Sequence, residues 1–437
     1  MNHDQTTDLR QWPISPDNKG FGPLAARDPV TAASLARAGV GLHDGELSYP
    51  LMTLRESALS HNIAAMADYC RRAGVELAPH GKTMMAPQLA ARQLAAGAWG
   101  ITVATPAQLQ VYYRYGVRRL LLANELVDAA GIQWLATTLG ADPELEVYCY
   151  VDSVEGVRLL EKGLASADAD PERTLPVLVE LGHPGGRTGA RSLEAAREVA
   201  AEAAAATHLR LAGAAGYEGS VGHHRDPDTL ARVADYCRGL RALSAELARS
   251  GLVAQRPLLS AGGSAFFDVV VAELTRTLPG EEQPPLVVLR SGAYITHDHG
   301  FYAGITPAGR DRQATATDSG GLTLQPALEL WAPVLSRPEP GLALLGAGRR
   351  DVSFDEGLPV PLRVRDGAGN TQPAADMSVT ALNDQHAYLR LPPSADLGPG
   401  DLVCLGISHP CTAFDKWRAI PVVDDDDRLT DVIHTFF

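Results

Sequence analysis

Between residues 50 and 302 the sequence alternates regularly between short apolar runs and longer segments with helical spacing. In the longer segments, apolar residues recur every third or fourth position, as on the buried face of a helix. About eight such strand and helix pairs predict an α/β fold, a parallel (β/α)8 TIM-type barrel, with an open doubly wound sheet as the alternative. The predicted barrel strands are 75–78, 101–104, 120–123, 145–151, 175–181, 211–216, 257–260 and 286–289. The predicted helices include 87–97, 106–115, 154–163, 193–207, 229–249 and 267–277.

The character of the sequence changes after residue 302. Prolines and glycines become frequent, helical spacing disappears, and short alternating runs follow at 327–334, 378–382, 386–391 and 402–407. This pattern predicts a β-rich C-terminal domain over 303–437, joined by an isolated strand at 50–55. Residues 1–49 show weak periodicity, and we expect an extension that lies on the surface or on a partner subunit. The expected organisation is therefore an extension (1–49), a barrel (50–302) and a β-rich domain (303–437).

Composition narrows the class of partner. With a formal charge of −14, the chain has no basic stripe to neutralise phosphates, so neither nucleic acid nor an anionic membrane is expected as a partner. No apolar run has the length of a membrane span, and residues 1–10 lack the features of a signal peptide. The cysteines are odd in number and lack CxxC spacing, which indicates a reducing compartment; they are Cys70, Cys149, Cys237, Cys404 and Cys411. We expect a cytoplasmic protein that binds a small molecule.

Lys82 lies where the predicted strand at 75–78 gives way to the predicted helix at 87–97. Barrel enzymes place their chemistry at this end of the strands. A lysine in such a place is either a solvated loop residue or an amine with a lowered pKa. In the second case it can form a Schiff base with pyridoxal phosphate or with a carbonyl substrate.

A glycine-rich turn follows the seventh predicted strand and leads into the helix at 267–277. It contains Gly262, Gly263 and Ser264. Glycines let backbone N–H groups approach an anion, and a helix N-terminus adds positive potential. Because barrel enzymes often bind phosphate after strands seven and eight, this turn is a candidate phosphate site.

A possible metal site lies near the C-terminus, where His409 and Cys411 flank Pro410. In an extended chain residues two apart point to the same side, so both side chains could reach one ion. Proline is excluded from central strands, which places the segment at an edge or a strand end. The alternative is a packed thiol beside a hydrogen-bonded imidazole. Thiolate and imidazole together favour Zn²⁺.

Several segments resemble the D-serine dehydratase and D-threonine aldolase family, whose members have the alanine-racemase-type fold of pyridoxal phosphate enzymes. The resemblance covers about residues 50–420 and rests on the segments Pro79-His80-Gly81-Lys82-Thr83, Arg187-Thr188-Gly189, Gly216-Tyr217-Glu218-Gly219, Arg290-Ser291-Gly292 and His409-Pro410-Cys411. The residue before the first of these segments is Ala78, where many members carry arginine, and Ser291 replaces the proline usual in the racemases.

The resemblance implies a role for each matching residue. Lys82 would carry pyridoxal 5'-phosphate, and Arg290 would lie near its pyridine nitrogen. Gly292 would lie near its phosphate, Arg187 near its phenolic oxygen or the substrate carboxylate, and Tyr217 in the active site. Arg290 as a surface residue and Tyr217 as a packed core aromatic are the competing interpretations. His409 and Cys411 would hold Zn²⁺, whereas the aldolases generally place aspartate at the cysteine position.

The resulting hypothesis is a pyridoxal phosphate- and zinc-dependent dehydratase of D-β-hydroxy amino acids, such as D-serine or D-threo-3-hydroxyaspartate, that yields a 2-oxo acid and ammonia. Freed Lys82 would remove the α-proton, and zinc would stabilise the leaving hydroxyl as a Lewis acid. The alternatives are a metal-dependent D-threonine aldolase, an amino acid racemase and a non-catalytic pyridoxal phosphate carrier. The resemblance also implies a head-to-tail homodimer, in which the active site lies between the barrel of one subunit and the β domain of another. The role of His386, which could orient a metal-bound group or lie free in a loop, stays open.

Overall fold

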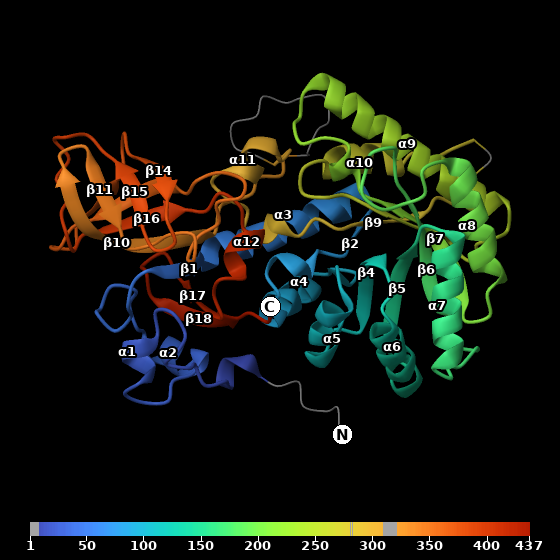
Figure 1. Ribbon diagram of the computed structural model, residues 1–437, viewed down its shortest axis with the longest axis horizontal. Coiled ribbons are helices and arrows are strands. Elements are labelled where there is room, and N and C mark those ends of the chain that lie inside the picture. The colour runs from blue at the N-terminus through green and yellow to red at the C-terminus, as the bar shows by residue number, and fades with distance from the viewer. Residues whose placement is uncertain (1–7, 280, 282, 309–320) are drawn as a thin grey trace.

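The computed structural model of the protein describes residues 8–279, 281, 283–308 and 321–437. Two bodies lie side by side, a barrel and a β-sheet body, and the long helix α3 (Glu56–Ala73) runs between them (Figure 1). Residues 309–320, part of the segment predicted to be β-rich, lie outside the described residues. Among the described helices, none combines the length and the apolar character that a membrane crossing demands.

The barrel is an eight-stranded parallel sheet with the order β2-β9-β8-β7-β6-β5-β4-β3. A parallel bridge between His80 and Thr102 joins the two end strands, and the Thr102 amide donates to the Pro79 carbonyl at 3.0 Å. The sheet is therefore closed, as the sequence predicted, and the open-sheet alternative is excluded. Its strands are β2 (Glu76–Leu77), β3 (Ile101–Val103), β4 (Arg119–Glu125), β5 (Glu146–Val151), β6 (Leu175–Leu181), β7 (Leu209–Gly216), β8 (Leu258–Ala261) and β9 (Leu286–Leu289).

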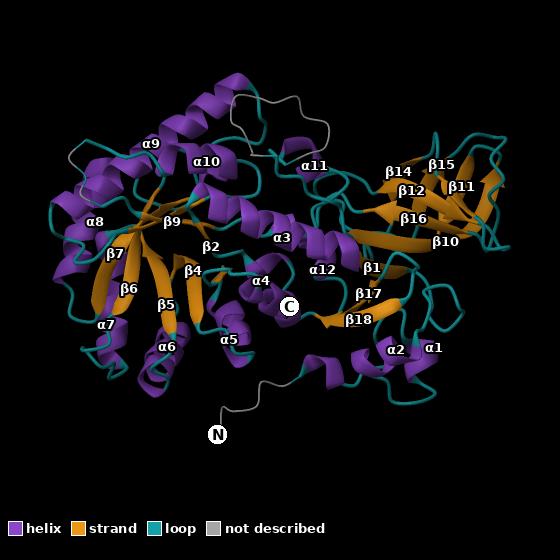
Figure 2. Cartoon of the chain, turned by 180° about the vertical axis from the view of Figure 1, so that it is seen from behind, coloured by secondary structure: helices purple, strands orange, loops and turns teal. Residues whose placement is uncertain are grey.

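Helices cover the outside of the barrel, most clearly in the view from behind (Figure 2). They are α4 (Pro87–Ala95), α5 (Pro106–Arg114), α6 (Ala129–Ala141), α7 (Val154–Ser166), α8 (Leu193–Ala205), α9 (Pro227–Arg249) and α10 (Phe267–Leu274). Polar side chains cap the N-termini of several helices by accepting a hydrogen bond from a backbone N–H of the first turn. The N-cap residues of α6, α7 and α8 are Asp128, Ser153 and Ser192. These caps fix where each strand-to-helix loop ends, and the loops together form the mouth of the barrel.

The second sheet is almost entirely antiparallel and has the strand order β13-β12-β16-β10-β1-β17-β18, with β11, β14 and β15 attached through β10. Its central strand β1 (Leu51–Arg55) precedes the barrel in sequence, and it pairs antiparallel with β10 (Leu328–Glu339) and parallel with β17 (Ala419–Val423). The other strands are β11 (Leu342–Leu345), β12 (Val360–Arg365), β13 (Thr371–Pro373), β14 (Ser378–Leu382), β15 (Ala387–Arg390), β16 (Leu402–Gly406) and β18 (Leu429–His434). The described part of the segment after residue 302 is thus rich in strands, and the strand predicted at 50–55 joins this sheet.

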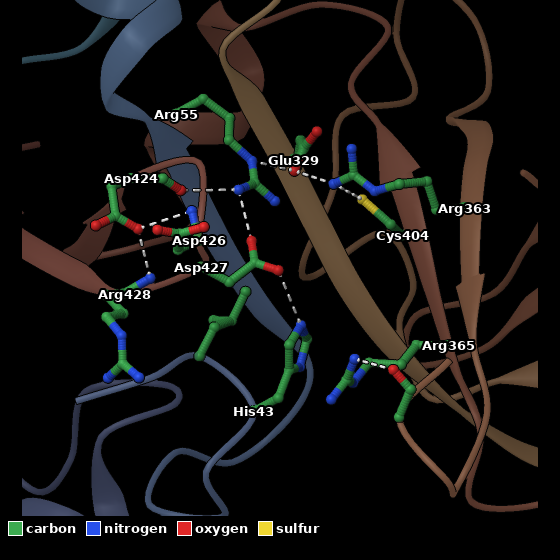
Figure 3. A network of polar contacts seen from close by, with 12 residues as sticks. His43, Arg55, Glu329, Arg363, Arg365, Cys404, Asp424, Asp426, Asp427 and Arg428 are labelled. Atoms are coloured by element: carbon green, nitrogen blue, oxygen red, sulfur yellow. Dashed lines mark hydrogen bonds and ion pairs between the residues drawn. The ribbon is translucent and has the colours of Figure 1, made fainter. Parts of the chain in front are cut away.

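Arg55 at the end of β1 connects three parts of this sheet (Figure 3). Its guanidinium donates to Glu329 on β10 at 2.9 Å and pairs with Asp427 in the β17–β18 turn at 2.5 Å. Arg363 from β12 reaches the same Glu329 carboxylate at 2.7 Å. The network holds the start of the barrel segment to strands that are more than 270 residues away in sequence.

The described part of the N-terminal segment packs on this sheet. Helix α2 (Ala32–Ala38) lies against β18, and the amide of Leu42 donates to the carbonyl of Asp427 at 2.7 Å. Phe21 and Leu35 are buried in the same core as the sheet. The described part of the extension therefore packs on the second sheet of its own chain.

Candidate active site

A cavity of about 310 Å³ opens among the carboxyl ends of the barrel strands. This volume lies within the range of roughly 300–1,000 Å³ that small-molecule sites occupy. Strand ends and the loops after them supply its walls, and the lining residues are His80, Lys82, Ala104, Ala123, Asn124, Tyr150, Arg187, Thr188, Tyr217, Gly263 and Arg290. Four of the predicted site residues therefore line one cavity: Lys82, Arg187, Tyr217 and Arg290. Gly263 of the glycine turn lines it as well.

Lys82 lies in a short 3₁₀ turn, Gly81–Thr83, between β2 and α4. The Lys82 side chain is exposed to solvent at the mouth of the cavity. Desolvation by the protein atoms packed around it is the main cause that lowers the pKa of the Lys82 amine; Cys411 acts in the opposite direction, and Arg187 and Arg290 lower the pKa further. Gly81 has to be a glycine because a Cβ there would lie 2.6 Å from the ring of Tyr112. A lysine amine of lowered pKa in a cavity is a candidate for covalent chemistry.

The sequence has four lysines, and the other three are placed differently. Lys19 pairs with Asp351, Lys416 pairs with Asp415, and Lys162 is exposed on the outer helix α7. Lys82 is the lysine that the structure places in the cavity.

Arg290 is buried at the bottom of the cavity with 6% of its surface exposed, so it is not a surface residue. It donates to Ser260 Oγ at 2.8 Å and to the Gly216 carbonyl at 2.6 Å. Two polar atoms near it, Tyr150 Oη and His80 Nδ1, are buried without a hydrogen-bond partner in the described part of the chain. Burial, followed by the charges of Lys82 and Arg290, lowers the pKa of His80 well below its ordinary value, so this imidazole is neutral. Unpartnered polar atoms at the wall of a cavity are what a polar ligand would satisfy.

The glycine turn after β8 differs in one respect from the phosphate site expected there. The amides of Gly262 and Gly263 donate at 3.0 and 2.6 Å to the carboxylate of Glu218, which is fully buried. Gly262 has φ +98°, which explains why glycine is needed at this position. The turn does bind an anion, but the anion is a side chain of the same protein. Ser264, the next residue, lies in the turn between Gly263 and α10.

Gly292 is buried at the end of the segment after β9. A Cβ at this position would lie 2.4 Å from the carbonyl oxygen of His80. A close approach between the two strand ends therefore requires this glycine, independently of any ligand.

Arg187 and Tyr217 are in contact with each other at the wall of the cavity. The Arg187 guanidinium lies 4.9 Å from the centre of the Tyr217 ring, within the range of a cation–π contact. The Tyr217 amide is held by Tyr236 Oη at 3.0 Å, and Tyr217 itself lines the cavity rather than only packing on the core. Burial raises the pKa of Tyr217, so its hydroxyl is protonated.

The segment with His409 and Cys411 reaches the same barrel mouth from the second sheet. Cys411 Sγ lies 3.4 Å from Thr83 Oγ1, and Thr83 is the residue after Lys82. Helix α12 (Cys411–Phe414) lies beside the Gly81–Thr83 turn, between α4 and the second sheet (Figures 1 and 2). The two candidate metal donors and the candidate cofactor lysine therefore meet within one chain.

The local conformation of this segment differs from the extended one expected. Pro410 has helical dihedral angles and Cys411 begins α12, so a turn rather than a strand connects the two donors. The side chains are still brought together. Burial disfavours the charge on His409, but the hydrogen bonds and charges of Cys411 and Asp355 outweigh it and raise the pKa of His409 to about 9.

Asp355 was not predicted and lies directly behind His409. Its carboxylate contacts His409 Nδ1 at 2.8 Å and accepts a hydrogen bond from Thr412 Oγ1 at 2.6 Å. A carboxylate on one ring nitrogen leaves the other, Nε2, available as a metal ligand, which is the usual arrangement behind a metal-bound histidine.

Other residues at the mouth were also missed. His80 and Tyr150 line the cavity, Glu218 fills the glycine turn, and Tyr302 packs on His409 with ring centres 6.0 Å apart. Strand alternation could have indicated Tyr150, because it is the last residue but one of the strand predicted at 145–151 and its side chain faces the cavity. The contact between Glu218 and the glycine turn spans 44 residues and has no local sequence signal.

These features define a barrel protein with a lysine of lowered pKa in a cavity at the mouth of the barrel, and comparisons with known proteins identify its family. Residues 54–280 match the family "Alanine racemase, N-terminal domain", and residues 327–423 match the "Putative serine dehydratase domain". The chain belongs to the alanine racemase N-terminal domain family. With its second domain it is a fold type III pyridoxal phosphate-dependent lyase. Its relatives include D-threonine aldolase and D-threo-3-hydroxyaspartate dehydratase.

Two characterised relatives show how far the similarity extends. A D-threonine aldolase from Arthrobacter sp is 27% identical over 380 residues, which cover 86% of this chain and 89% of that protein. A D-threo-3-hydroxyaspartate dehydratase from Delftia sp. (strain HT23) is 26% identical over 256 residues, 58% of this chain and 62% of that protein.

Solved structures of related enzymes have the same fold as this chain. The D-threonine aldolase from Filomicrobium marinum superposes with a TM-score of 0.72 at 26% identity, covering 91% of this chain and 97% of that chain. A cysteine-to-alanine mutant of D-threo-3-hydroxyaspartate dehydratase in the metal-free form superposes with a TM-score of 0.68 at 21% identity, covering 89% and 98%. The alanine-racemase-like architecture predicted from the sequence is therefore confirmed.

Proposed function

We propose that the protein is a pyridoxal phosphate- and zinc-dependent dehydratase of D-β-hydroxy amino acids, such as D-serine or D-threo-3-hydroxyaspartate, which yields a 2-oxo acid and ammonia. One observation carries the proposal: Cys411 Sγ lies 3.4 Å from Thr83, beside Lys82, so a soft metal ligand and a lysine of lowered pKa share one barrel mouth. Elimination of a β-hydroxyl needs both functions, a base for the α-proton and an acid for the leaving oxygen.

The cavity fits pyridoxal phosphate in its size and in its polar lining. Lys82 would hold the cofactor, which would supply an electron sink for the reaction at the α-carbon. Arg290, held by Ser260 and Gly216, would face the pyridine nitrogen, while Arg187 and Tyr217 would orient the phenolic oxygen or the substrate carboxylate. Because Glu218 occupies the amides of Gly262 and Gly263, we assign the phosphate to the far side of this turn, near Ser264 and Gly292.

Lys82 would also act as the base of the reaction. Its lowered pKa increases the neutral fraction of the amine near pH 7, and a neutral amine at this place can accept the α-proton. His80 beside it is neutral and adds no positive charge that would repel the proton. The chain thus supplies its own base.

His409 and Cys411 would hold the metal, with Asp355 behind His409. A thiolate and an imidazole favour Zn²⁺, and two protein ligands leave positions open for water and the substrate hydroxyl. The ion supplies Lewis-acid stabilisation of negative charge on the departing oxygen.

A D-threonine aldolase is the second candidate, because an aldolase of that specificity is the relative that matches 86% of this chain. The same lysine and metal would then support cleavage of the bond between the α and β carbons. Cys411, where the aldolases generally carry aspartate, favours the dehydratase. Incubation of the purified enzyme with D-serine, D-threonine and D-threo-3-hydroxyaspartate, with ammonia, oxo acid and glycine all measured, decides between them. We expect oxo acid and ammonia in equal amounts; glycine as the sole amino acid product would refute the dehydratase.

The structure also predicts the effect of Asp355→Asn. The amide cannot stabilise a metal-bound imidazole as the carboxylate does, and loss of such a partner typically lowers metal affinity about 10- to 100-fold. Competition with a fluorescent zinc chelator measures this affinity. Asp415→Asn is the matched control. Asp415 is close to His409 in sequence, and among the described residues its only ion pair is with Lys416. Equal zinc affinities for the two variants would exclude Asp355 as the residue that positions His409.

We further propose a cytoplasmic homodimer. The five cysteines are all free, as expected in a reducing compartment. The cofactor lysine and the metal donors already meet within one chain, so a dimer would complete the walls of the site rather than bring these groups together. A fully active monomer in size-exclusion chromatography with mass detection would contradict the dimer.

A further inference from the structure

One continuous segment connects the cofactor cavity to the candidate metal donors. It starts after β9 with Arg290, which lines the cavity, and it continues to α11 (Phe301–Ile305). Helix α11 lies between the barrel and the second sheet in both views of the chain (Figures 1 and 2). The segment therefore spans the gap between the two bodies that carry the site.

Backbone hydrogen bonds join this segment to the residues that follow β16. The His299 amide donates to the Ile407 carbonyl at 2.9 Å, and the Phe301 amide donates to the Ser408 carbonyl at 2.9 Å. Gly300 lies between the two donors, and a Cβ there would lie 2.8 Å from the Cα of Ser408. The two backbones therefore approach each other so closely that the position requires glycine.

Asp298 determines the shape of the turn between these bonds. Its side chain is 1% exposed, and its carboxylate accepts three backbone N–H groups at 2.9, 3.1 and 3.1 Å, from Gly300, Tyr302 and Ala303. The amides of His299 and Phe301 bond to the second sheet instead. A different turn would leave a buried carboxylate without partners, which is costly. The Asp298 carboxylate thus fixes the backbone from residue 298 to residue 303.

The same turn places two aromatic rings on the imidazole of His409. The ring centres of Phe301 and Tyr302 lie 5.9 and 6.0 Å from that of His409, at interplanar angles of 62° and 60°. Aromatic rings attract each other in edge contacts at this distance. Asp355 contacts Nδ1 of the same imidazole at 2.8 Å. The ring of His409 is therefore held by one carboxylate and two aromatic side chains.

We propose that Asp298 is a positioning residue for the metal site, because it shapes the turn that holds Phe301 and Tyr302 against His409. The inference rests on the proposed function, since it assumes that the His409 segment binds the metal. The same segment carries Arg290 at its other end, so it also ties the position of the metal to the wall of the cofactor cavity. Asp298 acts through these contacts and takes no part in a chemical step.

The zinc affinity of the pyridoxal phosphate-loaded enzyme, measured by competition with a fluorescent chelator, tests the proposal. We expect Asp298→Ala to lower the affinity about 10- to 100-fold, as is typical when the support of a metal-bound histidine is removed. Tyr302→Leu should lower it about 3- to 10-fold, the contribution of one aromatic edge contact. Tyr302→Phe keeps the ring and should therefore keep the wild-type affinity.

Cobalt provides a second measurement, which a loss of stability alone would not change. Co²⁺ bound to the same donors absorbs visible light in d–d bands whose positions and intensities depend on the coordination geometry. These bands should change in Asp298→Ala and in Tyr302→Leu, and they should match the wild type in Tyr302→Phe. Melting temperatures in the presence of a chelator show which variants are folded. If Asp298→Ala does not fold, the comparison of the two Tyr302 variants decides.

Asp128→Ala is the matched control. Asp128 also accepts a backbone amide, that of Gly131 at 2.7 Å, but it caps α6 on another loop of the barrel. This variant should melt at a lower temperature and keep the wild-type zinc affinity.

Three results would overturn the inference and leave the metal site in place. They are wild-type zinc affinity and cobalt bands in Tyr302→Leu or in folded Asp298→Ala, an equal loss of zinc affinity in Asp128→Ala, and an equal loss in Tyr302→Phe and Tyr302→Leu. A different result would refute the metal site and this inference together: a wild-type enzyme that binds zinc no more tightly than its His409→Ala variant.

Discussion

Replacing Lys82 with alanine is expected to lower the turnover of D-β-hydroxy amino acids at least ~10³-fold, because the residue is both the cofactor anchor and the base. The variant should also lose the yellow colour that pyridoxal phosphate acquires when it is bound to a lysine amine. Absorbance spectra after reconstitution and a coupled oxo-acid assay measure the two effects.

Lys162→Ala is the matched control, since Lys162 is exposed on α7, on the outside of the barrel. It should keep both colour and activity. A Lys82→Ala protein that stays yellow would show that another amine holds the cofactor, and the assignment of the cavity would then be wrong.

Removal of either metal donor is expected to have the second largest effect. Lewis-acid stabilisation of several kcal/mol at a leaving hydroxyl corresponds to roughly 10²- to 10³-fold in rate. His409→Ala and Cys411→Ala should each lose bound zinc and most of the oxo-acid production, while the yellow colour remains because Lys82 is intact. Zinc content by mass spectrometry and the coupled assay on the same samples provide the measurement.

His386→Ala separates the metal site from a general effect of histidine loss. His386 is exposed in the loop between β14 and β15, so this variant should keep zinc and activity. Full oxo-acid production by a zinc-free His409→Ala enzyme would exclude the metal from the reaction and would favour a metal-independent mechanism.

The barrel could be predicted because its local signals agree with one another. Strand β6 spans Leu175–Leu181, as the apolar run predicts, and Ser192 begins α8 where a capping residue precedes the helical pattern. Strand ends were less predictable: β7 begins at Leu209, two residues before the predicted start, because pairing with Leu175 of β6 extends the ladder. Such pairing depends on the neighbouring strand, so the sequence of residues 209–216 alone does not indicate where the strand begins.

The site was predictable as far as short motifs reach. The residues of the Lys82 and Arg290 segments meet in one cavity because parallel strands bring their carboxyl ends to one edge. The contacts of Glu218 with the Gly262–Gly263 amides could not be predicted, because a glycine turn looks the same whether a phosphate or a side chain fills it. Pro410 was read as part of an extended segment, but proline is also favoured at helix starts, and here it precedes α12.

The position of β1 in the middle of the second sheet has a consequence for biosynthesis. Its partners β10 and β17 leave the ribosome only after the entire barrel has been made, so residues 51–55 wait unpaired through most of translation. A chain that stops near residue 302 would carry every strand of the barrel and Lys82, but neither neighbour of β1 nor the donors His409 and Cys411. Prematurely terminated products would therefore be unable to carry out metal-assisted elimination, and their unpaired strand would be a ready target for proteases and chaperones.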